Sequence, residues 1–391
     1  MVVQHNLQAM NSNRMLGVTT SSQAKVTEKL SSGYKINRAA DDAAGLSISE
    51  KMRKQIRGLD QASNNAQDGV SAVQTAEGAL AEVHDMLQRM NELAVQAANG
   101  TNSTSDRTAI QNEIKQLTTE IDRVAETTKF NETYLLKGDV NGSTKTITLK
   151  PHDAGLKGSM GTVNETDHKV TFKLDSIAVS DKVMIGGKEY KIVATADKDQ
   201  NNGLIDTDTA KNLMKAELVK ANSIGLDAPL AEDKVTGDLT SGFEITMGAQ
   251  TVANALSFNL HVGADADMTN KIGVSIETMN SAYLGVKDLD VVGTDGLGTQ
   301  ATYAIDAIAD AIQKVSDQRS ALGAVQNRLE HTIKNLDNVV ENTTAAESQI
   351  RDTDMASTMV EYTKNNILQQ AGQSMLAQAN QSTQGVLSLL G

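Results

Sequence analysis

Apolar residues recur every three or four positions over both ends of the chain, a spacing that predicts long amphipathic helices. In the N-terminal part this stripe comprises Met52, Ile56, Leu59, Ala66, Val70, Val73, Leu80 and Leu87. A polar turn at 99–105 follows, and we expect a second helix beyond it, with Asp106 near its positive N-terminal end. The apolar stripe of that second helix is Ile110, Ile114, Leu117, Ile121 and Val124.

The C-terminal part carries the longest regular pattern. Nine of eleven successive heptad seam positions are apolar: Ile305, Ile308, Ile312, Val315, Leu322, Leu329, Ile333, Leu336 and Val340. Arg319 and Gln326 occupy the other two. Because heptads of this length are typical of coiled coils and helix bundles, we expect this helix to pair with the N-terminal helices. A single helix lying on a globular core is the alternative.

Residues 365–391 contain no charged side chain, and they predict a helix that packs against other protein. Its stripe of small and apolar residues is Leu368, Ala371, Met375, Ala379, Ser382, Val386 and Leu389. A shorter stripe near the N-terminus is Val3, Leu7 and Met10. Such segments bury too little apolar surface alone to offset their ordering entropy. We therefore interpret both tails as self-assembly elements that are loose in a monomer and ordered when packed.

The middle of the chain has a different pattern. Both prolines, Pro151 and Pro229, lie there, so long helices are possible on either side. Alternating residues predict strands at 144–149, 169–174 and 188–193, with a hairpin turn at 184–188 and a helix at 208–223.

The pattern as a whole predicts a mainly α fold with a β-rich insert. Both chain ends form a long antiparallel helical bundle or coiled coil, and the central domain projects outward. We expect terminal assembly segments at 1–40 plus 350–391, a helical spoke domain at 41–143 plus 252–349, and a β-rich surface domain at 144–251.

Composition narrows the function. The 391 residues include no cysteine, so no thiolate serves as a nucleophile or metal ligand, and no disulfide forms. A net charge of −13 argues against nucleic acid and anionic membranes as partners. No apolar run is long enough to span a membrane, and no cleavable secretory signal is visible, so export would need another route.

Three local patterns resemble ligand sites but favour a structural interpretation. Gly296, Gly298 and Ala301 follow a strand-like run, yet no βαβ unit precedes them, which favours a turn leading into the last long helix over a dinucleotide site. Asp197, Asp199 and Asn201 resemble a calcium loop that lacks the glutamate at its twelfth position, which favours a solvated loop. The histidines are scattered, and no catalytic set stands out. We expect no enzyme, cofactor or metal.

Several ordered motifs at both ends resemble those of bacterial flagellins. At the N-terminal end they are LSSGYKINRAADDAAGLSI at 30–48, IRGL at 56–59, NNAQDG at 64–69, QTAEGAL at 74–80 and LQRMNELAVQ at 87–96. At the C-terminal end they are LGAVQNRL at 322–329, IRDTDMA at 350–356, ILQQAG at 367–372 and LAQANQ at 376–381. The resemblance covers about 1–140 and 253–391, and the insert between them matches nothing, as expected of that family's variable surface domain.

The resemblance implies a structural subunit that polymerises into the flagellar filament for motility. In that family both termini line the filament's inner channel, and subunits are exported unfolded and fold on assembly. The implied partners are other copies of the chain, the export apparatus, an export chaperone, and the filament cap and hook-junction proteins. The implied location is the extracellular filament. Departures at Asn91, Glu132 and Ser382–Thr383 put detailed contacts, though not the family, in question.

The resemblance also implies recognition by a vertebrate Toll-like receptor. The residues that match the receptor-binding motif are Gln88, Arg89, Leu93 and Glu113. The alternative is that Leu93 packs inside and the polar residues form a solvated helix face.

Two other classes of protein share some of these features. A hook–filament junction protein of the same superfamily has similar helical arms but adapts rather than polymerises. A chemoreceptor-like bundle also has heptads rich in Ala and Gln, but it needs a membrane anchor that this sequence does not show.

Overall fold

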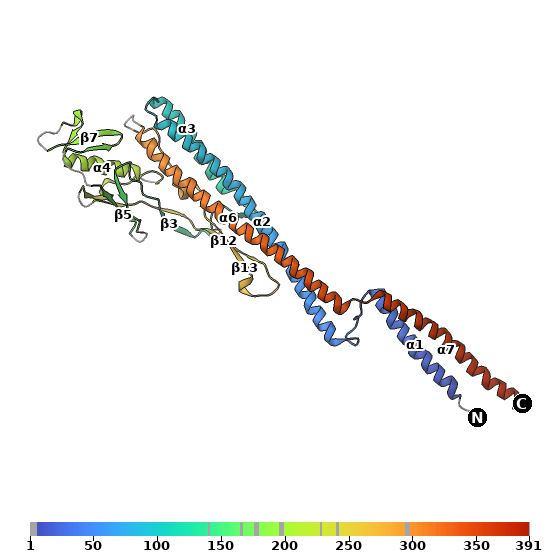
Figure 1. Cartoon of the computed structure of the whole chain (residues 1–391). Coiled ribbons are helices and arrows are strands. Elements are labelled where there is room, and N and C mark those ends of the chain that lie inside the picture. The colour runs from blue at the N-terminus through green and yellow to red at the C-terminus, as the bar shows by residue number, and fades with distance from the viewer. Residues whose placement is uncertain are drawn as a thin grey trace. The chain divides into compact units, whose positions relative to one another are not determined.

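The computed structural model describes residues 6–139, 141–164, 167–175, 180–194, 199–226, 229–239, 242–293 and 298–390, with the backbone alone for 201 and 382–390. The described part is mostly helical at both ends and β-rich in the centre, which confirms the predicted fold class (Figure 1). The chain divides into two compact units, which we describe separately. Unit 1 comprises Met1–Asn65, His261–Asn270 and Thr332–Gly391, and unit 2 comprises Ala66–Leu260 and Lys271–His331. The predicted three-part division stays a prediction.

Three long helices build the main core of unit 2. They are α2 (Ala43–Ala98), α3 (Thr104–Thr127) and α6 (Thr299–Arg351), of which α2 and α6 continue into unit 1. The predicted stripes face this core: Leu80 and Leu87 of α2 and Leu322 of α6 are fully buried. Ile114 and Ile121 of α3 complete the seam. The heptad spacing therefore predicted the packing correctly, because residues seven apart return to the same side of a helix.

The connection between α2 and α3 is fixed by polar side chains. Ser103 and Asp106 form a capping box at the start of α3, and hydrogen bonds from Ser103 lower the pKa of the Asp106 carboxyl. Arg107 is 1 % exposed, and its guanidinium donates to the carbonyl oxygens of Ala97 (2.9 Å) and Asn99 (3.3 Å). These carbonyls lie at the end of α2, where no helical amide reaches them. A buried cation on α3 thus caps the C-terminal end of α2.

In unit 1, the terminal helices α1 (Leu7–Ser32) and α7 (Met355–Leu390) lie side by side and run antiparallel (Figure 1). Helix α1 ends at Gly33, whose positive φ of 76° suits glycine. Beside it, the Thr353 amide donates to the Gly33 carbonyl at 3.0 Å, and the Lys35 amide donates to the Arg351 carbonyl at 2.6 Å. The two breaks, between α1 and α2 and between α6 and α7, are therefore tied together by backbone hydrogen bonds.

The start of α2 and the end of α6 also lie in unit 1. Ser63 donates to Asp337 at 3.2 Å, and Arg53 lies 3.5 Å from Glu347. Residues 261–270 pack against α2 so closely that a β-carbon at Gly58 would lie 2.9 Å from the β-carbon of Ala264. Glycine is needed at this position because a side chain would collide with that turn.

The β-rich part of unit 2 forms several small sheets. A four-stranded antiparallel sheet has the order β4 (Gly158–Met160), β5 (Lys169–Leu174), β10 (Gly242–Thr246), β9 (Val235–Asp238). A three-stranded sheet has the order β6 (Lys182–Ile185), β7 (Lys188–Ile192), β8 (Leu204–Ile205). The two-stranded sheets pair β1 (Lys129–Phe130) with β2 (Thr133–Tyr134), β3 (Thr144–Thr148) with β11 (Ala249–Ala253), and β12 (Leu256–His261) with β13 (Lys271–Ile276).

A second core joins the four-stranded and three-stranded sheets to helix α4 (Thr207–Ala221). Its largest buried side chains include Phe172 and Phe243, which are direct partners across β5 and β10. Tyr303, near the start of α6, belongs to the same core, and its hydroxyl lies 2.9 Å from a Glu217 carboxylate oxygen on α4. The β-rich part therefore packs directly on α6.

Most of the elements predicted for the middle of the chain are confirmed. Strands β3, β5 and β7, the Gly186–Gly187 turn and helix α4 lie where the alternation placed them. The pattern did not identify β12 and β13, or the short helix α5 (Ser281–Leu284). The strand-like run that precedes Gly296, residues 288–293, is not a strand. Its backbone binds a side chain instead of a neighbouring strand: the Gln111 side-chain amide donates to the Leu289 carbonyl at 2.6 Å and accepts from the Val291 backbone amide at 2.7 Å.

Replacing Arg107 by alanine is expected to lower the free energy of unfolding of unit 2 by about 2 kcal/mol, because the buried Ala97 carbonyl loses its side-chain donor and the Asn99 carbonyl keeps only the Asn102 amide. Urea unfolding followed by circular dichroism measures this loss. Arg123→Ala is the matched control, since Arg123 on the same helix is exposed and pairs with Glu120 one turn away. Equal unfolding midpoints for the two variants would contradict the role assigned to Arg107.

Candidate functional site

The surfaces of α1 and α7 that face each other consist mainly of small and polar side chains. On α1 these positions are Ala9, Ser12, Leu16, Thr19, Ser22, Val26 and Leu30. On α7 they are Thr358, Tyr362, Asn365, Gln369, Gly372, Leu376 and Ala379. A seam of this composition buries little apolar surface, so the pair gains little stability from the hydrophobic effect.

Specific contacts nevertheless align the two helices. The Asn365 amide is buried and donates to Ser22 at 3.2 Å, and near the chain ends the Asn6 amide donates to the Ala379 carbonyl at 3.0 Å. Leu16 lies over Gly372, where an added β-carbon would be 3.4 Å from the leucine methyl group. A buried amide requires its partner, so these contacts favour one register over others.

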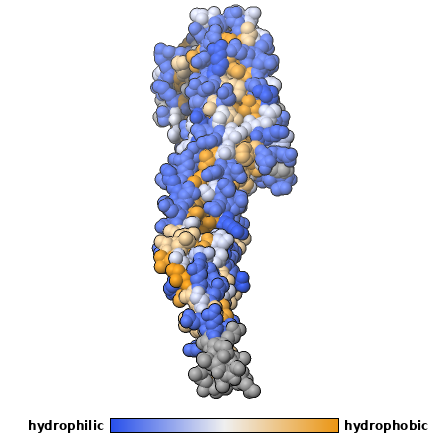
Figure 2. Space-filling view, turned by 90° about the vertical axis from the view of Figure 1, so that its right-hand side faces the viewer, coloured by the Kyte–Doolittle hydropathy of each residue, from blue (hydrophilic) through white to orange (hydrophobic). Residues whose placement is uncertain are grey.

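Ten of the larger apolar residues of the pair point away from the seam. They are exposed by 48 to 71 % and comprise Leu7, Met10, Met15 and Val18 of α1 and Met355, Met359, Val360, Ile367, Leu368 and Met375 of α7. Figure 2 shows such exposed apolar side chains near the lower end of the view. We call this set the outward stripe. Part of it lines a shallow depression of about 530 Å³ formed by Met359, Val360, Thr363, Lys364, Ile367 and Leu368.

The structure places the residues of the two assembly stripes predicted from the sequence, one on each terminal helix. Leu7 and Met10 of α1 and Leu368, Ala371 and Met375 of α7 are exposed, whereas Ala379 is buried against α1. The seam passes beside the α7 stripe, through Gly372 and Leu376, and the role of these residues in self-assembly stays a prediction. Val3 lies outside the described residues, as do the side chains of Val386 and Leu389.

Sequence reasoning missed the first half of the outward stripe. Met355 and Met359 are four residues apart, and Val360 and Ile367 are seven apart, so a helical signal was present. The charged residues Glu361 and Lys364 interrupt this apolar pattern, so the stretch resembled an ordinary solvated helix face.

The residues that match the receptor motif do not all reach the surface. Gln88, Arg89 and Glu113 are exposed, and Arg89 on α2 lies 2.9 Å from Glu113 on α3 and 3.0 Å from Glu92. The Glu113 carboxylate, followed by Glu92, raises the pKa of the Arg89 guanidinium. Leu93 is 2 % exposed and belongs to the helical core, so its side chain positions α2 rather than offering a contact surface.

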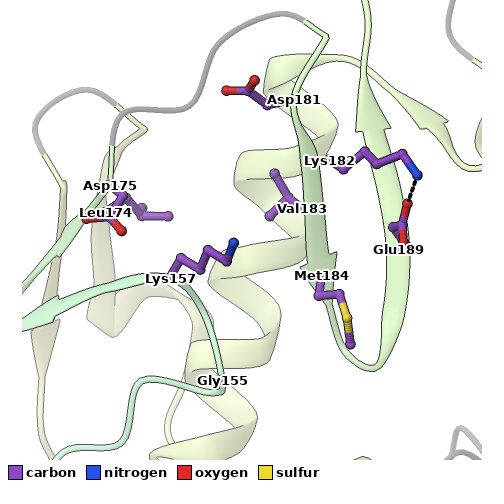
Figure 3. A pocket seen from close by; sticks show the side chains of 9 residues that line it. All are labelled: Gly155, Lys157, Leu174, Asp175, Asp181, Lys182, Val183, Met184 and Glu189. Atoms are coloured by element: carbon purple, nitrogen blue, oxygen red, sulfur yellow. Dashed lines mark ion pairs between the residues drawn. The ribbon is translucent and has the colours of Figure 1, made fainter.

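The β-rich part contains a cleft of about 610 Å³. It is lined by Gly155, Lys157, Leu174, Asp175, Asp181, Lys182, Val183, Met184 and Glu189, and Figure 3 shows Lys157 pointing into it while Lys182 pairs with Glu189. Charges of both signs line the cleft without a nucleophile and base in contact, so the lining suggests no reaction.

Both ligand-like sequence motifs lie partly outside the described residues. Among the described residues, no group of three or more His, Asp or Glu side chains is arranged to hold a metal ion. Asp197 and Gly296 fall outside the described residues, and Asp199 accepts from the Asn202 amide at 2.7 Å. None of the described helices has a stretch that is long and apolar enough to cross a membrane.

A charged cluster joins the segment after β3 to α6. Lys150 lies 2.7 Å from Asp310, and the His152 ring lies 3.9 Å from the other oxygen of that carboxylate. Burial lowers the pKa of His152, an effect that the nearby carboxylates of Asp310 and Asp306 partly oppose. Burial also raises the pKa of Asp306 and lowers that of Lys314 to about 8. The cluster stabilises a contact within unit 2 and does not resemble a catalytic site.

Comparison with known proteins agrees with this arrangement. The model of the bacterial flagellin N-terminal helical region matches residues 3–141, and that of the C-terminal helical region matches 305–390. A flagellin of Clostridium tyrobutyricum is 44 % identical, covering 98 % of this chain and 100 % of that protein. A flagellin of Halalkalibacterium halodurans is 40 % identical over 100 % of both chains.

Solved structures give weaker likeness. A Bacillus cereus flagellin aligns with a TM-score of 0.34 and 19 % identity over 70 % of this chain and 88 % of that one. A hook-associated protein of Legionella pneumophila aligns with a TM-score of 0.40 and 17 % identity over 77 % and 98 %. Scores this low do not separate the two kinds of protein.

The fold and surfaces are those of a structural protein with paired terminal helices. The chain belongs to the bacterial flagellin family, whose members are components of the extracellular flagellar filament.

The stability of unit 2 is expected to fall as the pH drops below about 6.5, the ordinary pKa of histidine. The folded state holds His152 neutral through a lowered pKa, whereas the unfolded chain takes up a proton at its ordinary pKa, so acid favours unfolding. Urea unfolding of the parent and of His152→Gln across pH 8 to 5 measures the effect. Below pH 6.5, the free energy of unfolding should fall less steeply with decreasing pH in the variant than in the parent. Above pH 7.5 the two slopes should match. Identical slopes below pH 6.5 would refute the role of His152.

Proposed function

We propose that this chain is a flagellar filament subunit that polymerises by packing the outward stripes of α1 and α7 against other copies of itself. The observation that carries the proposal is the placement of apolar residues in unit 1. Inside the helix pair the seam is small and polar, while Val360, Ile367 and Met375 are exposed by 61 to 71 %. A monomer gains nothing from this arrangement, whereas a polymer buries the exposed residues.

The energetics of assembly agree with this view. Fully burying one Val, Leu, Ile or Met side chain is worth roughly 1.5–3 kcal/mol. Burying several residues of the outward stripe at once offsets the loss of translational freedom and the ordering of the tails. The absence of charge from residues 365–391 helps, because no ion pair or isolated charge has to be desolvated there.

Export and the other partners follow from family membership. We infer that the chain is secreted unfolded through the growing filament, with help from an export apparatus and chaperone, and that it meets cap and hook-junction proteins at the filament ends. A chain without cysteine forms no disulfide that would block passage in an unfolded state. The alternative of a junction protein is not favoured, because the curated relatives that match the full chain are flagellins and filament core proteins.

Replacing Ile367 by glutamine is expected to raise the critical concentration for polymerisation about tenfold or more, since burial of one large apolar side chain is lost. Sedimentation of seeded filaments measures the critical concentration. The helix content of the soluble protein should be unchanged, because Ile367 is 61 % exposed there. Ile367→Leu is the matched control and should polymerise like the parent. Normal polymerisation of Ile367→Gln would count against the outward stripe as the assembly surface.

A second proposed role is recognition of the α2–α3 face by a vertebrate Toll-like receptor. Support comes from the exposed ion pairs of Arg89, which present a guanidinium beside Gln88 and Glu113 on two rigid helices. Arginine is among the residues that contribute most to binding when they become buried in an interface.

Arg89→Ala is expected to weaken receptor signalling by about tenfold or more, because truncating a central interface arginine costs about 2 kcal/mol of binding free energy. Reporter cells that express the receptor measure the response. Arg123→Ala, an exposed arginine on α3 that pairs along its own helix, is the control. Full signalling by the Arg89 variant would exclude the role.

A further inference from the structure

The break between α1 and α2 and the break between α6 and α7 meet at Tyr34. Its neighbours on either side are tied by backbone hydrogen bonds to the segment between α6 and α7: the Gly33 carbonyl accepts from Thr353, and the Lys35 amide donates to Arg351. Tyr34 itself forms an isolated antiparallel bridge with Asp352. The residue therefore lies at the centre of a short two-stranded tie. Helix α1 ends beside this tie, and the antiparallel helix α7 begins there.

Two guanidinium groups flank the Tyr34 ring. The guanidinium carbon of Arg351 lies 4.7 Å from the ring centre, and that of Arg53 lies 5.8 Å away. These distances allow cation–π attraction, which is stronger where water is excluded. The Arg351 side chain is only 12 % exposed, so the ring face replaces part of the solvation that the cation has lost.

Carboxylates complete the cluster from two helices. Glu50 of α2 lies 2.8 Å from Arg351 and 3.9 Å from Arg53, and Glu347 of α6 lies 3.5 Å from Arg53. The ring is thus the link through which side chains of α2 and α6 reach the segment that follows α1. Removing it would leave one face of the poorly solvated Arg351 guanidinium without a contact, which favours movement of that side chain into water and loosening of the adjacent backbone tie.

We propose that Tyr34 is a positioning residue that couples pairing of α1 with α7 to the ends of α2 and α6. The seam between α1 and α7 buries little apolar surface and has few register-setting contacts, so a fixed end at the tie strengthens the alignment that those contacts favour. The ring is the operative part. The hydroxyl, 3.5 Å from Arg53, adds little. That this alignment prepares the outward stripe for assembly rests on the proposed function; the coupling itself does not.

A remote reporter of helix pairing tests the proposal. A β-carbon at Gly372 would lie 4.0 Å from the β-carbon of Leu16, within the range of a disulfide. The chain has no cysteine, so Leu16→Cys with Gly372→Cys creates a single possible intramolecular disulfide in the full chain. The rate of its formation under mild oxidation, separated from intermolecular products by gel mobility, reports aligned pairing four to five helical turns from Tyr34.

Three variants in this background separate the ring from mere bulk. Tyr34→Phe should form the disulfide within about twofold of the parent rate. Tyr34→Leu and Tyr34→Ala should form it about tenfold more slowly, because a leucine of similar size offers no face to a cation. Equal rates for Phe and Leu, or a parent-like rate for Ala, would overturn the proposal. Circular dichroism melting of unit 2 checks that the rest of the chain stays folded.

Sedimentation of the same proteins keeps the two proposals apart. A chain that shows the predicted order of disulfide rates but never forms filaments would refute polymerisation and leave the role of Tyr34 standing. A chain that polymerises while all Tyr34 variants form the disulfide at equal rates would refute the role of Tyr34 and leave polymerisation standing.

Discussion

The structure depends on one apolar seam, along which α2, α3 and α6 bury their heptad residues against one another. Leu80 and Leu87 come from one end of the chain and Val315 and Leu322 from the other, yet all four are fully buried together. The long helices have no other source of stability on this scale, because isolated helices gain little beyond local hydrogen bonds in water. Polar groups at the helix ends, such as Arg107, decide where each helix stops and add a smaller contribution to stability.

The terminal helices are built on the opposite principle. Their seam contains Ser22, Asn365 and Gly372 where a stable coiled coil would have leucine or isoleucine, and most of their large apolar residues face outward. Such a pair gains little hydrophobic stability from its own seam. The helical core and the β-rich part give the chain its folded body, and in the proposed filament other copies would cover the exposed residues of the ends.

The β-rich part is coupled to the helices rather than merely attached to them. Tyr303 extends from α6 into the second core and contacts Glu217, and Lys150 pairs with Asp310 on the same helix. Tyr303 and Glu217 are buried, and such polar groups are costly unless each one finds its partner, so this contact specifies a single docking arrangement. The lowered pKa of His152 is a consequence of that docking, since the ring is buried against α6 when the two parts meet.

The sequence alone determined the elements whose signal is local and repeated. The heptads of α6, the stripes of α2 and α3, the alternation of β3, β5 and β7 and the glycine turn at 186–187 were all readable, because periodic burial leaves a periodic pattern. Family membership was equally readable from the ordered motifs at both ends.

Only the tertiary structure decided which face of each helix meets which partner. Spacing could not assign Ala379 to the seam and Met375 to the surface, because several stripes of similar composition run along a charge-free helix. It could not bury Leu93 while exposing Arg89, nor bring Tyr34 between Arg53 and Arg351. These contacts join residues far apart in the chain, and their free energy exists only once the helices have packed.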